Sequence, residues 1–200
     1  MITPSPQRVA RLAITVLLVG ACCSASQAAV RPAALTASGA IGPLQLGRSD
    51  RVAVFAFAGR PDAERRGKEP GYEPYRALGY GCRGNPGRNA MQLAPRGPYC
   101  RTVFFVNVPT GKLGTFFTTS ALYRGPHGVR VGMATATAER LLHRRLRVAC
   151  GENIVFLGTK TILTIQFVGG TERADRTVIG GHVNAFVLES RRHDAGTFDC

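Results

Sequence analysis

Cysteines are the residues of this chain best suited to chemistry, because their thiolates can bind metals, act as nucleophiles or oxidise to disulfides. The sequence holds six. Cys22 and Cys23 follow an apolar run near the amino terminus. Four more lie further along the chain, at Cys82, Cys100, Cys150 and Cys200. An even number of cysteines in an exported chain predicts disulfides, and four cysteines allow three pairings.

We favour the pairs Cys82–Cys100 and Cys150–Cys200. The first would close a loop rich in glycine and proline, residues 83–99, between two short extended segments. The second would tie the last residue of the chain back to the body. Each bridge would stabilise the fold by about 2–4 kcal/mol, because it restricts the unfolded chain.

The histidines do not indicate a metal site. They stand at positions 127, 143, 182 and 193, without ligand spacing, and the chain has no CxxC and no HExxH. Zinc sites usually carry such patterns, so solvated or core histidines are the better interpretation. We expect no metal and no cofactor.

Recognisable catalytic motifs are missing from the sequence. It contains no GxSxG elbow, no SxxK, no phosphate-binding GxxxxGKS loop and no Rossmann glycine pattern. Glu69 and Glu73 could form an acid pair, but Pro70 and Gly71 between them favour a loop with solvated carboxylates. A thiol enzyme needs a free cysteine near a histidine, whereas the four later cysteines are expected to be oxidised. The sequence assigns no catalytic residue and favours a protein that is not an enzyme.

The amino terminus has the pattern of a secretory signal peptide over residues 1–28. Met1–Arg11 is a polar lead with two arginines, Leu12–Ala21 is apolar, and Ser26-Gln27-Ala28 supplies small residues for cleavage. The apolar run is too short to span a bilayer core, which takes about 20 helical residues. We therefore expect a secreted or extracytoplasmic protein.

Two ways of processing this signal remain open. Cleavage after Ala28 would release a soluble protein and is the favoured one. In the alternative, Val19-Gly20-Ala21-Cys22 is a lipoprotein signal, and Cys22 becomes a lipid anchor at the outer face of the membrane. A diacylated amino terminus of that kind would hold firmly.

The chain is strongly basic, with a formal net charge of +14. Loss of the signal, which carries two arginines and no acid, leaves +12. Such a surface attracts anionic lipid, acidic wall polymer or acidic protein partners. The longest arginine block is Arg144-Arg145-x-Arg147, with no interleaved aromatics to stack bases, so a nucleic-acid partner is disfavoured.

A duplicated unit is indicated by two similar segments 85 residues apart. Each has an apolar pair at a two-residue period, then a glycine and a helix start. The matched positions are Leu44 with Val129, Leu46 with Val131, and Gly47 with Gly132. We predict a disordered leader at 29–39, a first α+β unit at 40–122 and a second at 123–200.

Helices are predicted after both glycines. Ser49 and Asp50 can cap a helix over Arg51–Ala58, which Gly59 and Pro61 can end. A second helix is predicted over Thr135–Arg147, where apolar residues recur at helical spacing.

Segments rich in β-formers follow each predicted helix. They are Tyr80–Arg83, Arg101–Val108, Lys112–Ser120, Asn153–Leu157, Thr159–Val168 and Thr177–Glu189. Pro109-Thr110-Gly111 indicates a tight hairpin turn, and Gly180-Gly181 a turn or bulge. The expected fold class is α+β, with two similar units, each a short helical segment packed on an antiparallel β-meander.

This pattern resembles the superfamily of the β-lactamase-inhibitor proteins and the small lipoprotein of outer-membrane β-barrel assembly. The matching segments are Val129-Arg130-Val131-Gly132-Met133 and Leu44-Gln45-Leu46-Gly47-Arg48-Ser49. The family usually starts its helix with Gly-Met-Thr or Gly-Met-Ser, and neither copy in this chain is complete. The resemblance implies tandem units, secretion and a disulfide in each unit. No contact residue of the inhibitors has a counterpart in this sequence.

We therefore expect a secreted, non-enzymatic binding module. It would inhibit an extracellular enzyme or take part in another protein interaction. It would use the concave face of a sheet and its loops. The alternatives are an extracytoplasmic hydrolase of unrecognised type, and a basic protein held electrostatically on anionic wall polymer or lipid.

Overall fold

The computed structural model describes residues 32–68, 73–83, 93–94, 97–98, 100–145, 147–149, 152–175 and 177–190. Several expectations therefore fall outside the described residues. They are the signal peptide, the lipid anchor Cys22, the Cys150–Cys200 bridge, Glu69 and His193.

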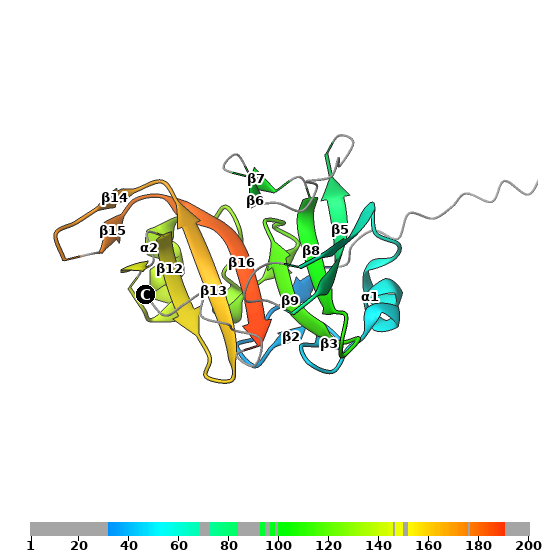
Figure 1. The fold of residues 1–200 in the computed structure, drawn as a ribbon. Helices are drawn as coiled ribbons and strands as arrows, with labels where there is room; N and C mark the ends of the chain where they lie inside the picture. The colour runs from blue at the N-terminus through cyan, green and yellow to red at the C-terminus, as the bar shows by residue number, and fades with distance from the viewer. Residues whose placement is uncertain are drawn as a thin grey trace, which may run out of the picture.

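An eight-stranded antiparallel sheet organises these residues (Figure 1). Its strands run in the order β11-β12-β13-β16-β9-β8-β5-β4. Their bounds are β4 (Ala63–Gly67), β5 (Tyr75–Cys82), β8 (Cys100–Asn107), β9 (Leu113–Thr118), β11 (Arg147–Ala149), β12 (Glu152–Leu157), β13 (Thr161–Val168) and β16 (His182–Ser190). The predicted α+β class, dominated by antiparallel sheet, is confirmed.

Each half of this sheet follows one helix in the chain. Helix α1 (Arg51–Ala58) precedes β4, β5, β8 and β9, and helix α2 (Thr135–Leu142) precedes β11, β12, β13 and β16. The last strands of the two series, β9 and β16, pair at the centre. The sheet is continuous across the boundary that the sequence predicted at residue 122.

The main hydrophobic core lies between the helices and one face of the sheet. Alternate residues of β8 and β13 belong to it, as a two-residue period requires: Phe104 and Val106 in β8, and Leu163, Ile165 and Phe167 in β13. An aromatic chain crosses its centre: the ring centroids of Tyr80 and Phe104 are 5.6 Å apart, those of Phe104 and Phe116 4.9 Å, and those of Phe116 and Tyr123 5.0 Å. Val54 of α1 and Ala138 of α2 belong to the same buried cluster, so one core serves both halves.

Helix α1 has the predicted bounds, and α2 is shorter than predicted. The Asp50 carboxylate accepts a hydrogen bond from the Ala53 N–H at 3.0 Å, and Gly59 ends α1 with a left-handed φ of 79°. The prediction that the second helix reaches Arg147 is wrong. His143 takes a left-handed φ of 51° and ends α2, and Arg147–Ala149 forms β11.

Residues 32–39 are not the disordered leader that the sequence predicted. Strand β1 (Ala33–Ala34) pairs in parallel with β10 (Tyr123–Arg124), and the Leu35 N–H donates to the Arg124 carbonyl at 2.7 Å. Leu35 is only 2% exposed. The small apolar side chains of this segment have a place in the core, which outweighs the entropy of ordering them.

Short elements complete the described chain. They are β2 (Ala40–Ile41), β3 (Leu44–Gln45), β6 (Leu93–Ala94), β7 (Gly97–Pro98), the 3-10 helix η1 (Pro126–Gly128), β14 (Thr171–Glu172) and β15 (Val178–Ile179). The predicted hairpin turn between β8 and β9 is confirmed, since the Gly111 N–H donates to the Asn107 carbonyl at 2.9 Å.

The two glycines matched in the sequence hold similar places. Gly47 has φ +73° and Gly132 has φ +86°, both in the left-handed region. The Gly47 N–H donates to the Leu113 carbonyl of β9 at 2.7 Å, and the Gly132 N–H donates to the Val183 carbonyl of β16 at 2.8 Å. Each glycine thus binds the segment before a helix to the last strand of that helix's own half.

Glu64 of β4 fastens α1 to the sheet. Its carboxylate accepts from Arg51 of α1 at 2.6 Å and also from Arg76 of β5. Burial alone would raise the pKa of Glu64, but the hydrogen bonds from Arg76 and Arg51 outweigh burial, and the pKa is lowered. The folded protein therefore favours the charged carboxylate.

Alanine at Gly47 or Gly132 is expected to destabilise the fold by about 1–2 kcal/mol, because an L-residue resists left-handed φ. No atom lies within 4 Å of a Cβ at either position, so the loss is conformational. Urea unfolding of G47A and G132A measures it. The matched variants G47N and G132N should lose less, since asparagine tolerates this conformation. Alanine variants as stable as the parent would contradict the assigned backbone.

Glu64→Gln is expected to lower the free energy of unfolding by about 1 kcal/mol at neutral pH. The lowered pKa means that this stabilisation is present above the ordinary glutamate range and is lost as pH falls through the folded pKa. Urea unfolding from about pH 6 to about pH 3 should therefore show parent and variant converging. Glu172→Gln, at an exposed carboxylate of β14, is the control and should show no such convergence.

Candidate interaction surfaces

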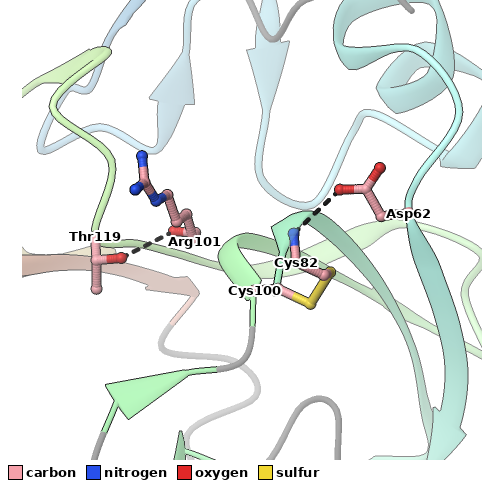
Figure 2. The surroundings of a disulfide bond; sticks show 5 residues. All are labelled: Asp62, Cys82, Cys100, Arg101 and Thr119. Carbon is pink, nitrogen blue, oxygen red and sulfur yellow. Dashed lines mark hydrogen bonds between the residues drawn. A yellow bond between two sulfur atoms is a disulfide. The ribbon is translucent and has the colours of Figure 1, made fainter. Parts of the chain in front are cut away.

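The Cys82–Cys100 disulfide joins two neighbouring strands, as the sequence predicted (Figure 2). The two cysteines are register partners at the end of β5 and the start of β8, and their Cα atoms are 3.8 Å apart. Cys100 is fully buried. A Cβ at Gly79 would lie 2.6 Å from the Cys100 Sγ, so the bridge packs over a position that admits only glycine.

Hydrogen bonds hold the backbone on both sides of this bridge. The Asp62 carboxylate accepts from the Cys82 N–H at 3.1 Å, and the Arg101 carbonyl accepts from the Thr119 hydroxyl at 3.4 Å (Figure 2). The first bond ties β5 to the segment before β4, and the second ties β8 to the segment after β9. The disulfide therefore sits in a braced part of the sheet and has a structural role.

The sheet face opposite the helices is also apolar. In the small buried cluster that contains Cys100, Tyr75 and Phe105 meet edge to face with ring centroids 5.3 Å apart. Further along, cross-strand register places Val103, Phe117, Val187 and Thr164 in one row. Val103, Phe117 and Thr164 are at most 5% exposed. The centre of this face is buried, so the exposed apolar side chains lie elsewhere.

A two-stranded arm carries two of these exposed side chains. Strands β14 and β15 extend the β13–β16 hairpin and project beyond the rest of the sheet (Figure 1). Val168 at its base is 44% exposed, and Ile179 on the arm is 50% exposed. The other large apolar residues exposed in the described chain, Val52, Val108 and Leu122, belong to other elements.

Four glycines form the corner between the sheet and the arm. They are Gly169, Gly170, Gly180 and Gly181, and all have left-handed φ. The two chain segments approach closely at this corner: a Cβ at Gly181 would lie 2.3 Å from the Gly169 carbonyl oxygen. The sequence predicted a turn or bulge at Gly180-Gly181. It did not reveal that this pair faces Gly169-Gly170 and redirects a hairpin.

The arm is fixed at its base and at its tip. At the base, the first N–H of α2, from Thr135, donates to the Gly181 carbonyl at 3.1 Å. At the tip, the Asp175 carboxylate accepts from the Thr177 hydroxyl at 2.6 Å and from its N–H at 3.1 Å. The hydroxyl bond is the main cause of a lowered pKa at Asp175. Hydrogen bonds thus hold the described residues of the arm at both of its ends.

The sequence assigned no role to the histidines, and the structure places two of them close together. The rings of His127 and His143 meet edge to face with centroids 6.3 Å apart, and His182 begins β16 at the base of the arm. Among the described residues, no group of three or more histidine, cysteine, aspartate or glutamate side chains could hold a metal ion. Glu73 is exposed, and its proposed acid partner Glu69 lies outside the described residues.

In the part of the chain that the structure describes, no helix has the length and apolar character needed to cross a membrane.

Comparison with solved structures shows a distant likeness in fold. No protein-family model matches the sequence, and no curated protein matches it. The fold is similar to the crystal structure of the uncharacterised protein YfeY from Escherichia coli, with a TM-score of 0.50 and 14% sequence identity. The match covers 78% of this chain and 98% of YfeY. At this identity the likeness concerns the fold alone.

Replacing both Cys82 and Cys100 by alanine is expected to lower the free energy of unfolding by about 3 kcal/mol, because the bridge restricts the unfolded chain across 18 residues. Urea unfolding of parent and variant without reductant measures this loss. Peptide mapping of the unreduced parent should recover the 82–100 linked peptide. Rapid alkylation of both thiols in the native, unreduced parent would contradict the bridge.

Proposed function

We propose that this protein is a non-enzymatic binding module that works outside the cytoplasm and grips a partner protein with its arm. The observation that carries the proposal is the arm, described over residues 168–175 and 177–181, which presents Val168 and Ile179 to solvent on a hydrogen-bonded hairpin. Exposed apolar side chains on a preshaped element lose little entropy on binding, which favours a protein interface.

The extracytoplasmic location is supported by the disulfide and by the amino-terminal sequence. Structural disulfides persist in oxidising compartments and are rare in the cytosol. The lead, apolar run and small residues of 1–28 have the order of a secretory signal. Release as a soluble protein is the favoured outcome, and lipidation at Cys22 is the alternative.

We further propose that the fold arose by duplication of one α+β unit, as in the β-lactamase-inhibitor superfamily. Each half has a helix followed by four strands of the sheet. The equivalent glycines Gly47 and Gly132 share their φ region and their hydrogen bond to the last strand of their own half. These correspondences support a common ancestor for the halves, and tandem units of this kind suit a binding protein.

The arm differs between the two proposed units and therefore gives them separate tasks. In the second half, β13 and β16 run on through the glycine corner into β14 and β15. In the first half, the corresponding strands β8 and β9 are joined by the tight turn at residues 108–111. The first unit thus has a short turn at the place where the second unit has the arm, which is the proposed binding element.

Site-specific photo-crosslinking in cells that naturally produce the protein tests this function. A photoreactive side chain at Ile179 is expected to form a covalent adduct with a protein other than itself, and one at Val168 with the same protein. Val52, 75% exposed on α1, and Val108, 51% exposed after β8, are matched control positions.

The pattern of adducts decides the proposal. Adducts at both arm positions and at neither control position support an arm interface. Equal labelling at arm and control positions, or adducts only with a second copy of the chain, would count against a partner gripped by the arm. A double variant, V168S/I179S, should reduce recovery of that partner by at least about tenfold, as expected for two apolar contacts.

A further inference from the structure

We propose that a pocket at the carboxyl end of α2 binds a phosphate group. The pocket has a volume of about 470 Å³. Its lining residues run from the second residue of α2 to just past the end of the helix: Ala136, Glu139, Arg140, His143, Arg144 and Arg145. No residue of the arm lines this pocket, so either proposal can fail without the other.

Charge is the first argument for an anion. Three arginines line the pocket against one acidic residue, Glu139. The ion pairs of the described chain at Glu64 and Asp50 engage Arg51, Arg76 and Lys112, and do not involve these three arginines. Since like charges repel one another, an anion that bridges the guanidinium groups would relieve their repulsion.

The helix dipole does not oppose such an anion strongly. A helix carboxyl end carries negative partial charge on its unpaired carbonyls. In α2 the Glu139 carbonyl accepts from the Arg144 N–H at 3.2 Å, and the Arg140 carbonyl accepts from the His143 N–H at 3.4 Å. These bonds pair two of the last four carbonyls of α2, which weakens the opposition of the helix end to an anion.

Two histidines in strained conformations provide the second argument. Among the described residues, His127 and His143 are the non-glycine residues with left-handed φ, at 56° and 51°. Glycine and asparagine are the usual residues at such positions, and histidine is one of the few others found there. Both are histidine instead, and their rings meet edge to face, so His127 of η1 braces the ring of His143 beside the pocket. Strain of this kind concentrates at ligand sites.

The donor set indicates phosphate. Guanidinium groups present pairs of N–H donors that match two oxygens of one phosphate, and imidazole adds a further donor. A tetrahedral phosphate can accept from several such groups at once. The volume leaves room for the phosphate together with part of the molecule that carries it.

Isothermal titration calorimetry with inorganic pyrophosphate tests the pocket. The parent protein is expected to bind it, and R140Q/R144Q/R145Q is expected to bind at least about tenfold more weakly, as the loss of charged hydrogen bonds implies. The control R60Q/R83Q/R101Q removes the same charge from three exposed arginines of the first half and should change affinity less than about threefold. Equal losses in the two triple variants, or no binding by the parent, would overturn the proposal.

A histidine variant distinguishes specific binding in this pocket from nonspecific attraction to the basic surface. H127N/H143N keeps residues that tolerate left-handed φ and removes both rings. It should unfold at nearly the parent's temperature yet bind pyrophosphate about threefold more weakly, as the loss of one hydrogen bond implies. Unchanged affinity in this variant would remove the histidines from the site and contradict the second argument for it.

Vesicle sedimentation then identifies the source of the phosphate. Binding to phosphatidylglycerol vesicles, with release by pyrophosphate and no binding by R140Q/R144Q/R145Q, assigns the site to a lipid headgroup. Pyrophosphate binding without vesicle binding assigns it to a soluble phosphorylated compound. Vesicle binding that persists in R140Q/R144Q/R145Q would show that the membrane contact lies outside the pocket and would overturn a headgroup site there.

Discussion

The pairing of β9 with β16 is the contact on which the described structure depends most. Phe116 lies opposite Leu188 and Thr118 opposite Phe186, and the ladder between these strands makes one sheet out of two four-stranded series. The buried side chains that line this seam belong to the same cluster as residues of both helices. Each half therefore completes the core of the other, because neither series alone would bury the apolar residues along the seam.

The local elements of this fold could be predicted from sequence because their signals are local. Asp50 and Gly59 bracket α1, Pro109 and Gly111 mark the turn before β9, and alternating β-formers mark β8, β9 and β13. The Cys82–Cys100 pair was also predictable, since few residues separate the two cysteines and extended segments flank them.

Features that depend on distant partners could not be predicted from the sequence. The segment at Ala33–Leu35 looked featureless because its partner, β10, lies about 90 residues away. Strand β4 was missed because its sequence, AERRG, suits a charged sheet edge and lacks β-formers. The arm was missed because four glycines interrupt the apolar alternation, and the end of α2 was misplaced because His143 occupies a position where glycine is the usual signal. Both candidate surfaces depend on these same features, so the sequence did not predict them either.

The central seam also has a consequence for how the chain must fold. Within each half, successive strands are mostly neighbours, so both meanders can form from nearby residues. The seam joins positions such as Thr118 and Phe186, which are far apart in sequence, and non-local pairing of this kind is slow. Until β16 pairs with it, β9 has an unpaired edge with the apolar sequence LGTFFT. A polypeptide emerging amino terminus first would expose that edge to other copies, so aggregation during synthesis is the hazard that this topology creates.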